Sequence, residues 1–236
     1  MECRHEYKFI ISISQSVILK ERLTGLMKRD VNSGEKGSYE IRSIYFDDVH
    51  NSCFKQNEAG IDPRAKYRIR SYRLSDERIV LEKKIKQNGM TKKLQQKLTK
   101  EQYEILKRCD DRGVLKRPAD KELFFHDEPP LVKELLSLKQ MRLMCPKVIV
   151  AYERTPFVEE AGNVRVTFDD NISSSTKFED FFSPRLMKRP IMPVGQTLME
   201  VKFDEFLPEY IKETLELGKL SQTAFSKYYL CRRYSL

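Results

Sequence analysis

The sequence predicts a single α+β domain over residues 1–236, in which helices pack outside a closed antiparallel β-barrel of about eight strands. Three observations support this fold. Segments that alternate polar and apolar residues recur along the chain, helical patterns lie between and after them, and no internal repeat or low-complexity linker interrupts the chain. Closing the sheet into a barrel would remove its exposed edges.

Alternation with period two identifies the strands, and turn residues separate some of them. The pair Asn88-Gly89 predicts one hairpin turn, and Gly162 with Asn163 predicts another turn. The predicted strands cover residues 5–11, 39–46, 63–73, 77–86, 91–98, 147–157, 163–168 and 197–203.

Capping residues and proline mark the helices. Thr99 and Gln102 form the pattern of a capping box, and Pro130 suits the first turn of a helix. The predicted helices begin at or near Ser16, Thr99, Pro130, Pro208 and Ser221, and continue through about residues 27, 108, 141, 218 and 234.

Composition limits the environment and the partners of the protein. Lysine and arginine exceed aspartate and glutamate by 44 to 35, for a net charge of +9. This surplus favours an anionic partner, although a generally basic surface would give the same value. The cysteines are scattered without a CxxC pair, which argues against zinc and disulfides and predicts a cytoplasmic location. No signal peptide and no transmembrane segment is predicted.

The polar faces of the predicted strands carry mainly arginine and lysine. Lys66, Arg68 and Arg70 share one face of a single strand. On one strand this would ordinarily be the solvated side of a sheet. Repeated on several strands of a barrel, it predicts a lumen whose cations need a polyanion, and guanidinium groups bind phosphate through paired hydrogen bonds. The same alternation pairs Glu6 with Lys8, Glu82 with Lys84, Tyr152 with Arg154, Arg165 with Thr167, and Glu200 with Lys202.

An ordered set of motifs from about residue 3 to residue 234 resembles the catalytic domain of the VTC (vacuolar transporter chaperone) polyphosphate polymerases. It also resembles, more remotely, the triphosphate tunnel metalloenzymes, or CYTH proteins. The resemblance implies a tunnel that binds ATP and inorganic polyphosphate and transfers the γ-phosphate of ATP to the chain end. The motifs are RHEYKF, SIYFDD, KYRIRSY, VLEKKIK, AYERTPF, VRVTFDD, LMEVKF and FSKYYLCRR.

The resemblance also implies roles for individual residues. Carboxylates suit a divalent cation, Mn²⁺ or Mg²⁺, because hard cations prefer oxygen ligands. One departure is Ala224, where some family members carry a further lysine. The implied catalytic residues are Arg68, Arg70, Lys84, Arg154 and Arg165, the phosphate-binding residues are Lys8, Lys66, Tyr152, Lys202, Ser226 and Lys227, and the metal-binding residues are Glu200, Glu82 and Glu6. The alternative role for Glu200 is a salt bridge to a lysine of the lumen.

Two other functions remain open from the sequence. Tunnel triphosphatases typically begin with ExExK, but Arg4 stands at the first acid here, which favours a polymerase, while Glu6 keeps a hydrolase in consideration. A protein that binds polyphosphate without making it would use the same residue types.

No nucleic-acid partner is expected, because most aromatic residues fall on the face opposite the charges. A membrane-associated partner is left unassigned, and the pairs Asp47-Asp48 and Asp169-Asp170 are interpreted as turn caps.

Overall fold

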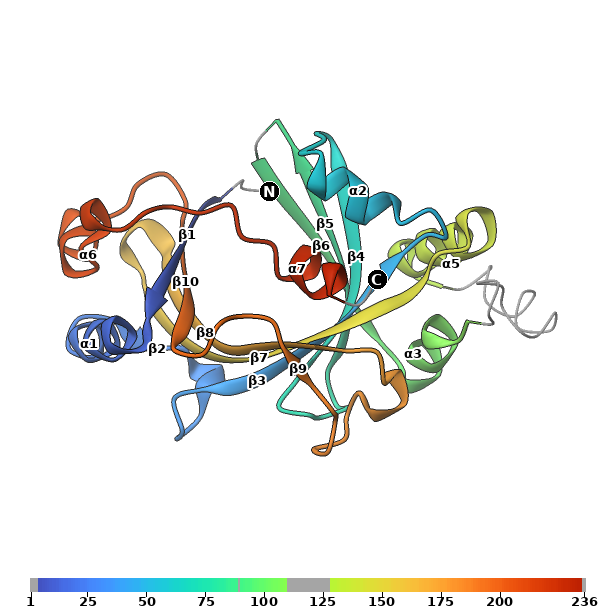
Figure 1. Ribbon diagram of the computed structural model, residues 1–236, viewed down its shortest axis with the longest axis horizontal. Coiled ribbons are helices and arrows are strands. Elements are labelled where there is room, and N and C mark those ends of the chain that lie inside the picture. Colours follow the sequence, from blue (N-terminus) through green and yellow to red (C-terminus); the bar gives the residue numbers. More distant parts are fainter. Residues whose placement is uncertain (1–3, 89, 110–127, 235–236) are drawn as a thin grey trace. The chain divides into compact units, whose positions relative to one another are not determined.

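The protein is described here by a computed structural model that covers residues 4–88, 90–109 and 128–234 (Figure 1). Antiparallel strands with helices beside them confirm the predicted α+β class. None of the described helices is both long and apolar enough to cross a membrane. The main elements are β1 (His5–Ser12), α1 (Ile13–Thr24), β2 (Lys28–Arg29), β3 (Tyr39–Asp47), α2 (Ser52–Glu58), β4 (Arg64–Tyr72), β5 (Ile79–Gln87), β6 (Met90–Leu98), α3 (Lys100–Lys107), α5 (Pro130–Arg142), β7 (Cys145–Glu159), β8 (Val164–Ser175), β9 (Arg189–Pro190), β10 (Gln196–Phe203), α6 (Glu209–Thr214) and α7 (Lys227–Arg233).

The prediction of a closed barrel is wrong. The main path of the sheet runs β1-β10-β8-β7-β3-β4-β5-β6, so that β1 and β6 are its two ends in the described part of the chain. The edge of β1 is covered by the segment before α7, since Thr223 N–H donates to Lys8 O at 2.8 Å and Phe9 forms a bridge with Gln222. Covering an edge with a loop protects it as closure would.

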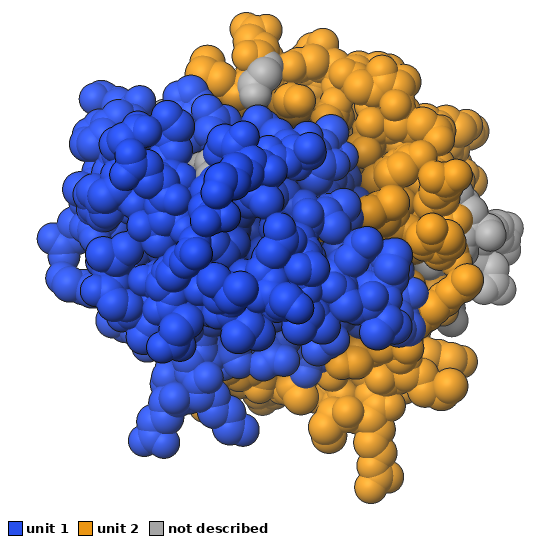
Figure 2. Space-filling view, turned by 60° about the vertical axis from the view of Figure 1, so that its left-hand side comes forward, with its two compact units in different colours: residues 1–40, 152–173, 190–226 blue, residues 41–151, 174–189, 227–236 orange. Residues whose placement is uncertain are grey.

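Contact clustering divides the chain into two compact units, which Figure 2 distinguishes by colour. Unit 1 contains residues 1–40, 152–173 and 190–226. Unit 2 contains residues 41–151, 174–189 and 227–236. Strands β3, β7 and β8 each contribute residues to both units.

In unit 1 the apolar face of β1, β10 and β8 is covered by helices. Helix α1 contacts β1 and β10, and also α6 (Figure 1). Leu23 of α1 and Ile211 of α6 are completely buried against the strands. Burial of this kind contributes about 25 cal/mol per Å² of apolar surface. Because side chains alternate along a strand, the charged residues of these strands lie on the opposite face.

In unit 2 helices α3 and α5 cover the apolar face of the β4–β5–β6 sheet. Both helices contact β6, and α5 also contacts β5. Leu106 of α3, Leu135 of α5 and Leu81 of β5 are completely buried. The register pairs Ile69 with Leu81, which places Arg68 of β4 and Glu82 of β5 opposite each other on the other face. The prediction that apolar strand faces pack on helices is confirmed within each unit.

Local signals placed some helices correctly and others not. The capping box of Thr99 with Gln102 and the first-turn position of Pro130 are both confirmed. Ser16 is not a cap, because α1 begins earlier, with Ser12 and Gln15 as its capping box, and Ser16 is buried within the helix. Ser221 is not a cap either, because α7 begins only at Lys227 after the segment that covers β1.

Gly162 is a position where a side chain should be costly. Its φ is +69°, and an added Cβ would collide with the carbonyl oxygen of Phe206 and lie 3.3 Å from Pro208 Cδ. Gly60 has nearly the same φ, +68°, with nothing within 4 Å of an added Cβ. We expect Gly60→Ala to cost about 1 kcal/mol from the left-handed backbone alone, and Gly162→Ala at least about 1–3 kcal/mol more. Urea unfolding of the two variants tests this, and equal losses would contradict it.

Candidate functional site

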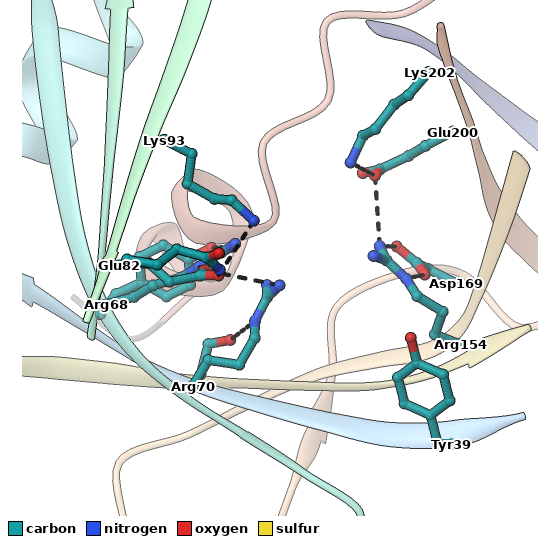
Figure 3. A network of polar contacts seen from close by, with 12 residues as sticks. Tyr39, Arg68, Arg70, Glu82, Lys93, Arg154, Asp169, Glu200 and Lys202 are labelled. Carbon is teal, nitrogen blue, oxygen red and sulfur yellow. Dashed lines mark hydrogen bonds and ion pairs between the residues drawn. The ribbon is translucent and has the colours of Figure 1, made fainter. Parts of the chain in front are cut away.

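Several of the predicted site residues lie in two networks of polar contacts, one in each unit (Figure 3). The Arg154 network, in unit 1, consists of Arg154, Asp169, Glu200, Lys202, Glu6 and Lys8. The Glu82 network, in unit 2, consists of Glu82, Arg68, Arg70, Lys93 and Gln95.

The Arg154 network begins with a bidentate ion pair between β7 and β8. Arg154 Nε and Nη2 donate to the two carboxylate oxygens of Asp169, each at 2.6 Å. Asp169 is completely buried and Arg154 nearly so. Burial disfavours the charged guanidinium, but Asp169 outweighs it and the pKa of Arg154 is raised. The ring of Tyr152 lies 5.2 Å from the guanidinium and adds a cation–π contact.

Charges of alternating sign continue from Arg154 across neighbouring strands. Glu200 Oε2 lies 3.5 Å from Arg154 Nη2 and 3.2 Å from Lys202 Nζ. Lys202 Nζ is also 3.4 Å from Glu6 Oε1, which is 3.7 Å from Lys8 Nζ. The strand register explains this order, because Lys8 pairs with Glu200 and Glu6 with Lys202. The cations and acids therefore hold one another in place on one face of the sheet.

Arg165 lies beside this network on β8. It is the cross-strand partner of Lys202. Its guanidinium pairs with Asp30 at 2.6 Å and donates to the Tyr39 hydroxyl at 3.4 Å. Asp30, which follows β2, is buried, so Arg165 is held by a carboxylate from another part of unit 1.

In the Glu82 network one buried carboxylate gathers several cations. Arg68 Nε donates to Glu82 Oε2 at 2.6 Å, and Arg70 Nη1 lies 3.8 Å from the same oxygen. Lys93 Nζ is 3.6 Å from the other oxygen, to which Gln95 donates at 2.5 Å. Glu82 is only 1% exposed. Burial alone would raise the pKa of Glu82, but Arg68, Arg70 and Lys93 outweigh it and hold this pKa well below its usual range.

Two polar side chains of β3 also hold the arginines of β4. Arg68 Nη1 donates to the Tyr45 hydroxyl at 2.7 Å, and Arg70 Nε donates to Ser43 Oγ at 3.1 Å. Each guanidinium therefore has a fixed position before any ligand binds. Such preorganisation lowers the entropic cost of binding an anion.

Three lysines lie in cross-strand register, and one of them, Lys93, also belongs to the Glu82 network. Lys66 of β4 is opposite Lys84 of β5, which is opposite Lys93 of β6. Like charges on directly opposite positions destabilise a sheet. Lys66 also donates to Asn57 Oδ1 of α2 and lies 5.4 Å from the ring of Tyr228. We call Lys66, Lys84 and Lys93 the lysine row.

The remaining predicted residues lie near the start of α7. Lys8 Nζ donates at 2.9 Å to the carbonyl oxygen of Phe225, so β1 contacts the segment that carries Ser226. Ser226 immediately precedes α7, and Lys227 is its first residue. Both are partly buried. Arg4, at the position of the missing acid, pairs instead with Asp204 at 2.6 Å.

Asp169 is the residue that the sequence interpretation misplaced. It does not cap a turn but lies inside β8 as the buried partner of Arg154. The signal was present, because Arg165, Thr167 and Asp169 alternate and so share one face. The capping role of Asp47 and Asp48 is confirmed, since their carboxylates accept backbone N–H groups at the start of α2.

The predicted metal ligands differ in how well they suit a cation. Both oxygens of Glu82 already contact cations or an amide donor. Glu6 and Glu200, by contrast, converge on the ammonium of Lys202 from two neighbouring strands. In the described residues, no group of three or more acidic, histidine or cysteine side chains is arranged to hold a metal. A pair of carboxylates that also uses phosphate oxygens remains chemically suited to Mg²⁺ or Mn²⁺.

Solved structures of other proteins share this fold. The structure is similar to the putative adenylyl cyclase HpAC1 from Hippeastrum, described as having a dominant triphosphatase activity, with 13% identity, a TM-score of 0.57, and coverage of 100% of this chain and 97% of that one. It is also similar to a putative adenylate cyclase from Bacillus halodurans, with 16% identity, a TM-score of 0.51, and coverage of 95% and 94%. At these identities the likeness shows a shared fold.

The VTC domain matches residues 3–235, and the chain belongs to the VTC domain family. No curated protein gives a significant match.

Proposed function

We propose that this protein is a polyphosphate polymerase, which transfers the γ-phosphate of ATP to the end of an inorganic polyphosphate chain. The observation that carries the proposal is the lysine row, which shares Lys93 with the Glu82 network. These three lysines, in cross-strand register, place positive charge along one face of β4, β5 and β6, where a chain of phosphates can bind along them. Membership of the VTC domain family supports the same function.

Transfer of a phosphoryl group depends mainly on the position of the reacting phosphates and on neutralisation of their negative charge, and less on a residue that donates or accepts a proton. A terminal phosphate oxygen of the chain attacks the γ-phosphorus, a new P–O bond forms, and the bond to the β–γ bridging oxygen breaks to release ADP. The acceptor oxygen is already anionic, so no proton has to be removed. Arg68 and Arg70 in unit 2, and Arg154 and Arg165 in unit 1, are suited to neutralise phosphate oxygens in such a reaction.

Lysines and the segment before α7 complete the proposed phosphate contacts. Lys8 and Lys202 lie on one face of β1 and β10, and Lys66 and Lys84 lie on one face of β4 and β5. Ser226 and Lys227 are proposed to contact phosphate from the start of α7, and Tyr152 to support Arg154 from below its guanidinium plane. As compact charges, lysines can follow a chain without a fixed geometry.

A divalent cation fits Glu6 and Glu200 better than Glu82. We propose that these two carboxylates hold Mn²⁺ or Mg²⁺ together with phosphate oxygens, while Glu82 orients the arginines. When bound, such an ion would neutralise charge that develops on the phosphates. Lys202, which contacts both carboxylates, would then be released toward phosphate.

A triphosphatase is the second candidate, and the activity described for HpAC1 favours it. Hydrolysis requires a group that accepts a proton from water. Arg68, Arg70 and Lys93 lower the pKa of Glu82, which makes it a poor base. Arg4 replaces an acid and is paired with Asp204, so the start of β1 offers Glu6 as its one acid. These features favour transfer to phosphate over transfer to water.

One assay separates the candidates. Purified protein is incubated with ATP, a short polyphosphate primer and Mn²⁺ or Mg²⁺, and ADP, free phosphate and long-chain polyphosphate are measured. We expect ADP and chain elongation in equal amounts, with little free phosphate. Free phosphate without elongation would identify a triphosphatase. Tight polyphosphate binding without either product would identify a binding protein.

A further inference from the structure

A buried lysine in unit 2 lies between a helix end and a cysteine. Lys139 of α5 is only 1% exposed. Its ammonium donates to the carbonyl oxygens of Leu106 and Arg108, at 2.9 and 3.0 Å, and to Cys109 Sγ at 3.1 Å. Two of its three donors therefore cap the end of α3, and the third contacts sulfur.

The charge of Lys139 needs a partner, because burying an unpaired ammonium is strongly unfavourable. Carbonyl oxygens at a helix end carry only partial negative charge. Within residues 4–88, 90–109 and 128–234, no carboxylate forms an ion pair with this ammonium. Among the contacts of this ammonium in the described part of the chain, Cys109 is the group that can carry a full negative charge, as a thiolate.

A second cysteine lies against the first. Cys145 is the first residue of β7 and directly follows Met144, whose carbonyl oxygen accepts from Cys109 Sγ at 3.9 Å. Cys145 is buried, whereas Cys109 is partly exposed. Cys109 is therefore the more accessible of the two residues.

We propose that Cys109 and Cys145 form a peroxide-sensitive thiol pair, in which Cys109 is the nucleophile, Cys145 is the resolving thiol and Lys139 is the fixed counter-charge. This modification site is separate from the Arg154 and Glu82 networks and does not depend on the proposed function.

The electrostatics of the site agree with this assignment. The hydrogen bond from Cys145, with the positive charges of Lys139 and Lys147, lowers the pKa of Cys109 to about 6, although burial opposes the shift. Cys53 and Cys231 provide the contrast within the same chain. Burial raises the pKa of each to about 12, so they stay protonated and unreactive at neutral pH.

The oxidation balances with hydrogen peroxide as the oxidant. The Cys109 thiolate attacks one peroxide oxygen, an S–O bond forms, the O–O bond breaks, and hydroxide leaves. Cys109 is then a sulfenic acid, oxidised by two electrons, while the peroxide is reduced. Cys145 attacks the Cys109 sulfur, an S–S bond forms, the S–O bond breaks, and the departing hydroxide takes the Cys145 proton as water. A dithiol reductant reverses the reaction.

Peptide mapping after peroxide treatment tests the pairing. We expect a reducible Cys109–Cys145 linkage and a loss of two hydrogen atoms per chain. Cys145→Ser should stop the reaction at a sulfenic acid on Cys109 that dimedone labels, and Cys109→Ser should abolish labelling. Cys53→Ser is the matched control and should leave the linkage unchanged. A different linkage, or no linkage before general oxidation of the protein, would overturn the proposal.

The role of Lys139 has its own test. Alkylation of Cys109 by iodoacetamide in the unmodified protein should follow a midpoint near pH 6. Lys139→Met should slow this alkylation about tenfold or more at neutral pH, since it removes the counter-charge. If this variant does not fold, the pH dependence of Cys109 alkylation in the unmodified protein still tests whether Cys109 is a thiolate at neutral pH. A midpoint near the ordinary thiol value of 9.0 would show that another group neutralises Lys139 and would overturn the assignment.

Discussion

Replacing Arg154 with alanine is expected to lower the free energy of unfolding by about 3–5 kcal/mol, because it leaves the Asp169 carboxylate buried without its partner. Asp169 is 0% exposed, and both of its oxygens accept from Arg154 at 2.6 Å. A loss of this size approaches the whole stability of many domains. Urea or thermal unfolding measures it, with circular dichroism at low temperature as the check that the variant folds.

The double variant Arg154→Ala/Asp169→Asn separates the buried charge from the lost contact. It removes the buried negative charge of Asp169, so we expect it to recover at least half of the stability lost by Arg154→Ala. Arg154→Lys is the matched conservative change, which keeps the charge but cannot form both hydrogen bonds. If Arg154→Ala and the double variant were equally stable, the ion pair would not be the cause. If the double variant is more stable, its enzymatic activity can be measured in a folded protein, and a loss of that activity is not due to unfolding.

The sequence predicted strands and faces well, because both depend on local alternation. Arg68 and Arg70 alternate with apolar residues, and the structure places them together on one face. The sequence also placed Glu82 on the charged face of its own strand. It did not show that Glu82 lies opposite Arg68. That position depends on the register between β4 and β5, which non-local pairing determines.

Two other features could not be predicted from the sequence, because they also depend on contacts between distant parts of the chain. The sheet is open, and residues 222–223 cover the edge of β1, a pairing that nothing in their composition predicts. Cys109 and Cys145 form no sequence motif, and only the packing of α3, α5 and β7 brings them to Lys139. Asp169, in contrast, could have been found by extending the alternation of β8 beyond residue 168.

Glu82 supports the arginines of β4, and this determines how they should be tested. Replacing Arg68 and Arg70 together leaves a 1%-exposed carboxylate with Lys93 and Gln95 as its remaining contacts in the network. We expect this double variant to lose about 3–5 kcal/mol of stability, so a loss of binding could reflect unfolding. Adding Glu82→Gln removes the buried charge and should restore most of the stability.

The pH dependence of unfolding tests whether the ionised carboxylate of Glu82 stabilises the folded protein. Its pKa in the folded protein lies below its ordinary value of 4.5. The ion pairs therefore stabilise the protein fully above that value, and their contribution is lost as the pH falls below it toward the folded pKa. We expect the stability difference between the unmodified protein and Glu82→Gln to be largest at neutral pH and to shrink in acid. A difference that does not change with pH would contradict this.

With stability restored, the Arg68→Ala/Arg70→Ala/Glu82→Gln variant tests phosphate recognition directly. We expect it to lose at least about tenfold in polyphosphate affinity, since each charge-assisted hydrogen bond contributes about 1.5–3 kcal/mol. Lys92→Ala is the matched control. Lys92 lies on the same strand as Lys93 but on the opposite face, paired with Ile85, so its removal should change affinity little. Equal losses in the two variants would mean that net charge, rather than the face of Arg68, Arg70 and the lysine row, attracts the chain.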